Sequence, residues 1–116
     1  MKEIYKLMRS AGISRSYRGY QYFAAAVKMI SEDETKLSNI RKEVYLPIAI
    51  RYKENIQNVE RDIRTIRDVI VRDNKPFLKE LAPGEPYNIK APYPREIIEA
   101  FAEYVLSNGP LKKARE

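Results

Sequence analysis

The chain has 116 residues and a formal net charge of +6, and it contains neither cysteine nor histidine. Without these two residue types it cannot form a disulfide, a Cys/His zinc site or a nucleophile–histidine dyad. No spacing among the remaining carboxylates, lysines, tyrosines and hydroxyls indicates a catalytic pair. We therefore expect no enzyme activity, no catalytic or metal-binding residue and no cofactor.

The basic residues are unevenly distributed along the chain. Residues 1–30 carry six basic residues and one acidic residue, and residues 41–75 carry nine basic residues against six acidic ones. Such an excess permits nucleic-acid binding through phosphate neutralisation, although many domains of this charge bind no nucleic acid. No run approaches the roughly 20 apolar residues that span a bilayer, and no signal-peptide core is present. We expect a cytoplasmic protein that makes no membrane contact.

Apolar spacing predicts two helices in the first thirty residues. An apolar stripe in residues 4–8 predicts a first helix that ends near Gly12, and residues 14–19 read as a basic loop. From Tyr20 to Ile30, apolar residues recur at steps of three and four, which is typical of an amphipathic helix.

A third helix is expected after the acidic break at residues 31–35, whose charges favour a helix start, and it should end near Tyr45. Pro47 is tolerated in a first helical turn and can begin the next helix. A polar break at residues 53–55 follows. The helix that begins at Pro47 is therefore short.

The clearest predicted helix covers about residues 56–72. Its apolar residues fall at steps of 3, 4, 3 and 4 and share one narrow face: Ile56, Val59, Ile63, Ile66 and Ile70. Asn55 is the expected N-cap. The opposite face carries Gln57, Glu60, Arg61, Arg64, Thr65 and Asp68.

Prolines interrupt residues 74–95, which we expect to be mostly loop with a short helix at 77–81. Pro94 begins a last amphipathic helix, and residues 108–110 carry its stop signal. That helix either completes the core, which we favour, or forms a dimer surface. The predicted fold is an all-α, compact bundle of about six helices in a single domain, residues 1–110, with a frayed basic tail at 111–116.

The short helix at Pro47, the polar break and the long helix together predict a helix-turn-helix. Ala49 suits a close contact between the two helices, although Lys53 and Glu54 stand where the turn usually has glycine. The alternative is a pair of ordinary packed helices.

Side chains on the exposed face of the long helix can address base edges in a major groove. Arginine donates a bidentate pair to guanine and glutamate accepts from cytosine, so Glu60 and Arg61 are suited to adjacent C and G positions. The candidate base-reading residues are Gln57, Asn58, Glu60, Arg61, Arg64 and Thr65. The alternative is a solvated face with ion pairs from Glu60 to Arg64 and from Arg64 to Asp68.

The chain resembles the C-terminal DNA-binding effector domain of the sporulation-initiation response regulators of Firmicutes. The likeness runs from about residue 11 to 73, and more loosely through Lys90-Ala-Pro92 into the last helix. The residues that carry it are Gly12, Gly19-Tyr20-x-Tyr22, Val27, Met29, Lys42, Tyr45, Ile48-Ala49 and Val59-Glu60-Arg61-x-Ile63-Arg64.

This resemblance implies about six helices with a central helix-turn-helix, and binding to short boxes with a GTCGA-like core, often in adjacent copies. It also implies that Glu60, Arg61 and Arg64 face the DNA. From charge and position, the expected phosphate contacts are Arg51, Lys53 and Arg67. We expect Tyr20, Tyr22 and Tyr45 to be core residues rather than base-stacking ones.

The chain departs from the family pattern at several positions. Leu46 separates Tyr45 from Pro47, Arg67 replaces an apolar residue, and Asn58 and Thr65 stand at positions that are often basic. These changes would alter phosphate affinity or the preferred box. The family's receiver domain does not precede Met1, so the sequence is either a part of a longer protein or, as its native-looking start favours, a stand-alone effector domain.

The leading hypothesis is therefore a sequence-specific transcription regulator whose partner is double-stranded DNA. Further candidate partners are RNA polymerase, a receiver-domain protein and a second copy of the chain on an adjacent box. The alternatives are a degenerate effector domain that acts as a protein-interaction module and a non-specific DNA binder. Only the last would show strong salt dependence without any sequence preference.

Overall fold

The structure, a computed structural model, describes residues 1–73, 76–77, 81 and 92–108. Every regular element within these ranges is helical, which confirms the predicted all-α fold. In chain order the elements are α1 (Lys2–Ser10), α2 (Gly19–Glu32), η1 (Glu34–Asn39), η2 (Arg41–Tyr45), α3 (Leu46–Arg51), α4 (Ile56–Asp73) and α6 (Pro94–Asn108). No helix in the described ranges is long and apolar enough to cross a membrane.

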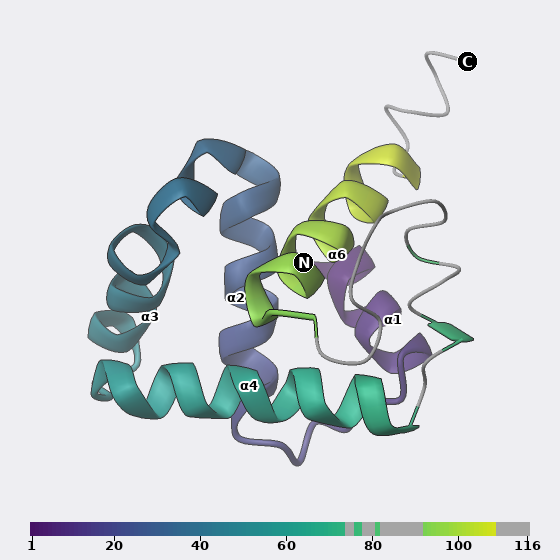
Figure 1. The fold of residues 1–116 in the computed structure, drawn as a ribbon, viewed down its shortest axis with the longest axis horizontal. Helices are drawn as coiled ribbons and strands as arrows, with labels where there is room; N and C mark the ends of the chain where they lie inside the picture. The colour runs from purple at the N-terminus through teal and green to yellow at the C-terminus, as the bar shows by residue number, and fades with distance from the viewer. Residues whose placement is uncertain (74–75, 78–80, 82–91, 109–116) are drawn as a thin grey trace.

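Helix α2 is the centre of the fold and contacts α1, α3, α4 and α6 (Figure 1). Its middle turns carry consecutive buried alanines, Ala24 to Ala26, which allow neighbouring helices to approach closely. Phe23 of α2 meets Phe101 of α6 edge to face, with ring centroids 5.0 Å apart. Phe101 is fully buried, so α6 completes the core, as expected.

The third helix was predicted as one regular helix, and this prediction is wrong in its geometry. The segment is a 3₁₀ helix, η1, followed by a π-helical turn, η2. At the start of η1 the Asp33 carboxylate accepts hydrogen bonds from the backbone N–H and the hydroxyl of Thr35. Such local bonds compete with regular helix hydrogen bonding. The wider turn of η2 buries both Val44 and Tyr45.

Helices α3 and α4 form the predicted helix-turn-helix. The N–H of Glu54 donates to the Ala49 carbonyl and that of Lys53 to the Ile50 carbonyl, which is a Schellman end of α3. Lys53 occupies the left-handed position of this turn, with φ of 54°. The Asn55 side chain accepts from the Asn58 N–H at 2.9 Å, which confirms Asn55 as the N-cap of α4.

The remaining boundaries agree closely with the sequence. Helix α6 begins at Pro94 and ends at Asn108, and the loop at residues 14–18 is non-helical. Tyr20, Tyr22 and Tyr45 are buried, as expected for core residues. Most of the predicted helix at 77–81 and the whole of the tail at 111–116 lie outside the described residues.

Candidate nucleic-acid interface

Helix α4 lies along one edge of the molecule (Figure 1), with one face in the core and the other in solvent. Val59, Ile63, Ile66 and Ile70 are buried against the other helices. The solvent face exposes Gln57, Arg61, Arg64, Thr65 and Asp68, while Asn58 and Glu60 are half-buried at its margins. The predicted base-reading residues therefore lie on or beside one continuous surface.

The first turn of α4 engages Asn58 in its own structure. The Asn58 side-chain amide donates to Glu54 Oε1 at 2.7 Å, and Glu54 also accepts from the Asn55 N–H at 3.0 Å. These two hydrogen bonds lower the pKa of Glu54, and the bond from Asn58 has the larger effect. Asn58 therefore stabilises the turn before α4, and it would have to leave Glu54 to donate to a base.

Two arginines dominate the solvent face of α4. Arg61 Nε lies 3.4 Å from Asp62 Oδ1, and its side chain remains 55% exposed. In the described part of the chain Arg64 makes neither a hydrogen bond nor an ion pair. Both guanidinium groups can therefore reach an external acceptor with little rearrangement.

The ion pairs that the alternative interpretation required do not form among the described residues. Glu60 pairs with Arg41 of η2 at 3.2 Å instead of with Arg64. Asp68 pairs with its neighbour Arg67 at 2.7 Å. The face is thus not stabilised by ion pairs one turn apart.

Arg41 is a residue of this surface that the sequence analysis missed. It lies 19 positions before Glu60, and no local spacing connects the two. Tyr45, on the same π-helical turn, is buried beside Glu60; burial first, and then the Glu60 charge, raise the pKa of its hydroxyl to about 12, although Arg64 opposes the shift. Glu60 is therefore held among η2 side chains at one margin of α4.

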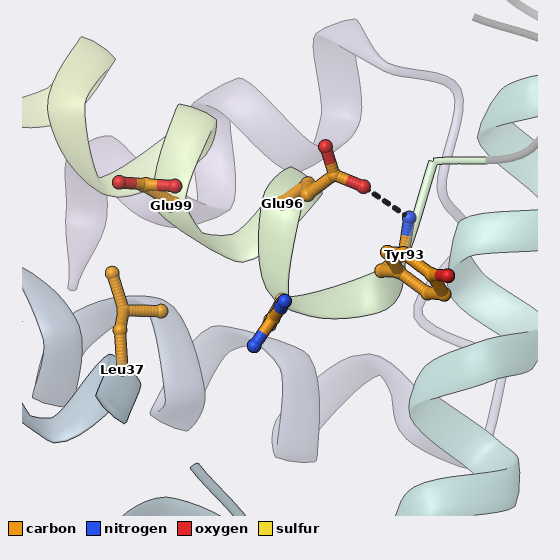
Figure 2. A pocket seen from close by; sticks show the side chains of 5 residues that line it. Leu37, Tyr93, Glu96 and Glu99 are labelled. Atoms are coloured by element: carbon orange, nitrogen blue, oxygen red, sulfur yellow. Dashed lines mark hydrogen bonds between the residues drawn. The ribbon is translucent and has the colours of Figure 1, made fainter. Parts of the chain in front are cut away.

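A surface hollow of about 370 Å³ continues this margin towards the start of α6. It is lined by Ile40, Tyr45, Glu60, Arg64, Tyr93, Pro94 and Arg95. A neighbouring hollow, shown in Figure 2, is lined by Leu37, Tyr93, Arg95, Glu96 and Glu99. There the Glu96 carboxylate turns back and accepts from the Tyr93 N–H at 2.8 Å. This bond satisfies the backbone N–H just before Pro94 and so caps the first turn of α6.

The three predicted phosphate-contact residues differ in side-chain exposure and in their contacts within the fold. Arg51 and Lys53 are exposed at the end of α3 and in the turn before α4. Arg67 is only 19% exposed in its side chain; its Nη1 donates to the Pro92 carbonyl at 3.1 Å. Arg67 therefore connects α4 to the segment before α6.

The basic loop lies against the other margin of α4. Gly19, the first residue of α2, packs directly on the backbone of Asp62. Arg15 and Arg18 of this loop are exposed, and Arg18 is close enough to help lower the pKa of Glu54. The sequence shows that the loop is basic, but no local spacing places it next to the long helix.

The comparison with known families identifies one family. Its model, described as "Sporulation initiation factor Spo0A C terminal", matches residues 4–105. No solved structure matches the chain.

Proposed function

We propose that this chain, which belongs to the Spo0A C-terminal family of sporulation initiation factors, is a sequence-specific DNA-binding transcription regulator. The family is one of DNA-binding domains. The proposal is that α4 enters the major groove of a short box with a GTCGA-like core. It is supported by one observation above all: the exposed face of α4 presents two available arginines, Arg61 and Arg64.

The chemistry of each side chain suggests its role at the bases. Arg61 and Arg64 can donate paired hydrogen bonds to guanine O6 and N7, and Glu60 can accept from the amino group of cytosine. Gln57 and Thr65 are exposed beside them and would add contacts at the ends of the box. Asn58 would contribute only after it leaves Glu54.

Phosphate contacts would fix the register of α4 in the groove. Arg51 and Lys53 are the best placed of the predicted residues, because both are exposed at the turn that precedes α4. Arg67 is the weakest candidate, because its guanidinium is already bound to Pro92 and Asp68. We also propose that a second copy of the chain can bind an adjacent box.

A protein contact is a second candidate function, and the surface of α3 favours it. Ile50 is 70% exposed and Leu46 is 41% exposed, although both are large apolar side chains. Exposed apolar residues that lie close together mark interaction surfaces. RNA polymerase and a receiver-domain protein are the partners that such a surface of a regulator would contact.

A binding titration at two salt concentrations tests the leading proposal. The chain would be titrated against a duplex with the GTCGA-core box and against a scrambled duplex of the same length. We expect a strong preference for the box, and a loss of about 1–3 kcal/mol of that preference in Arg61→Ala. Equal, salt-sensitive binding to both duplexes would indicate a non-specific binder.

Lys6→Ala is the matched control for charge, because Lys6 is exposed on α1. Among the described helices, α1 contacts α2 and α6 but not α4. This variant removes one positive charge and should retain the box preference. No binding to either duplex by the wild-type chain would favour the protein-contact function.

A further inference from the structure

We propose that Arg41 is a specificity-determining residue of the DNA interface, because its guanidinium positions the Glu60 carboxylate. This inference rests on the proposed function and concerns one contact of the same surface. Arg41 belongs to η2 and not to the helix-turn-helix. It would therefore influence base recognition from outside the motif.

The geometry places Glu60 between two helical elements. Arg41 Nε donates to Glu60 Oε1 at 3.2 Å, and the Glu60 side chain is 28% exposed while that of Arg41 is 56% exposed. Tyr45, four positions after Arg41 on the π-helical turn, is buried and close enough to Glu60 to be affected by its charge. The carboxylate is thus held beside two side chains of η2, and part of it remains exposed.

A carboxylate at a DNA surface needs such a partner. The phosphates of a duplex repel an unpaired negative charge, and a free glutamate side chain loses rotamer freedom when it binds a base. Arg41 counters both effects, because it supplies a positive charge and holds the carboxylate before DNA arrives. Pre-organisation of this kind favours the base whose donor group fits the fixed position of the carboxylate.

The guanidinium of Arg41 also has donors to spare. Arginine has five N–H groups, and within the described part of the chain only the Nε–H of Arg41 is engaged. The Nη groups can therefore donate to a backbone phosphate while Nε stays on Glu60. Arg41 would then connect a phosphate contact, which carries no sequence information, to a base contact, which does.

An ordinary surface ion pair is the competing explanation. Exposed pairs contribute little to stability, so both explanations expect Arg41→Ala to fold normally. The explanations differ in the effect of Arg41→Ala that they predict on DNA binding. A surface pair predicts no change in base preference, and a plain phosphate contact predicts uniformly weaker binding to every sequence.

The test is a double-mutant cycle on DNA binding. Wild type, Arg41→Ala, Glu60→Ala and the double variant would be titrated against the box and against duplexes with each core base pair replaced in turn. We expect Arg41→Ala to reduce discrimination by about tenfold at the base pair where Glu60→Ala also reduces it, near the low end for one good base contact. The double variant should lose no more discrimination than Glu60→Ala alone.

Two further variants make the result decisive. Lys6→Ala removes the same charge away from the interface and should keep full discrimination, and Arg41→Lys should recover only part of it, because lysine lacks the planar fork of arginine. Uniformly weaker binding by Arg41→Ala, or unchanged discrimination, overturns the inference while leaving the proposed function intact. A wild-type chain without any base preference overturns both.

Discussion

Gly19 lies against the backbone of Asp62 so closely that a methyl group on Gly19 would overlap the Asp62 carbonyl oxygen. This contact joins the first residue of α2 to the middle of α4. It also joins two sequence motifs, Gly19-Tyr20-x-Tyr22 and Val59-Glu60-Arg61-x-Ile63-Arg64. The helix that carries the candidate base contacts is therefore fixed against the central helix of the core.

Gly19→Ala should destabilise the fold because the added methyl group meets backbone atoms, which cannot move aside as a flexible side chain can. We expect the free energy of unfolding to fall by about 3 kcal/mol, at the upper end for overpacking. Gly12→Ala is the matched control. Gly12 has φ of 82° but open space around it. Gly12→Ala should therefore introduce only left-handed backbone strain, which should lower the free energy of unfolding by about 1 kcal/mol. Urea denaturation measures both, and equal losses would show that the contact with Asp62 is unimportant.

Lys53→Gly should separate stability from DNA binding. Lys53 holds the left-handed position at the end of α3, with φ of 54°, which glycine adopts without a Cβ penalty. We expect Lys53→Gly to raise the free energy of unfolding by about 1 kcal/mol and to weaken DNA binding through the loss of a phosphate contact. Lys53→Ala removes the same charge and keeps the strain, so it should bind DNA equally weakly without any gain in stability. A DNA affinity unchanged in both variants would remove Lys53 from the interface.

Regular helix periodicity made most of the fold predictable. The apolar face of α4 followed from residue spacing, and its Asn55 cap and the start of α6 at Pro94 followed from the preference of these residue types for helix starts. The segment from Glu34 to Tyr45 was mispredicted because side-chain hydrogen bonds, such as those of Asp33, set a 3₁₀ geometry there. The following turn is π-helical and buries both Val44 and Tyr45, an arrangement that regular helix spacing does not indicate.

The candidate site was only partly predictable, because one sequence gives the exposed face of a helix but not its neighbours. Arg41 meets Glu60 through a tertiary contact across 19 positions. Arg67 has a suitable charge, yet its guanidinium is turned towards Pro92. Neither arrangement leaves a signal in local spacing.

Tyr45 should make the fold sensitive to alkaline pH. Burial and the Glu60 charge raise the pKa of its hydroxyl to about 12 from the ordinary tyrosine value of 10.0. Between these values the unfolded chain loses the proton and the folded chain keeps it, so stability falls as pH rises above about 10. We expect at most about 2–3 kcal/mol to be lost across that window. Thermal melts from pH 8 to 11 should show a shallower decline in Tyr45→Phe, and identical declines would contradict this assignment.

Arg67→Ala should weaken the fold rather than the electrostatic attraction to DNA. The variant leaves the buried Pro92 carbonyl without the donor that holds it at 3.1 Å, which should cost about 1–2 kcal/mol of unfolding free energy. The slope of log affinity against log salt should stay unchanged, because a guanidinium bound inside the fold releases no counterion from DNA. Arg51→Ala is the comparison, since an exposed phosphate contact should reduce that slope by about one. If Arg67→Ala reduces the slope and keeps full stability, then the guanidinium leaves Pro92 on binding, and Arg67 contacts phosphate as its charge first suggested.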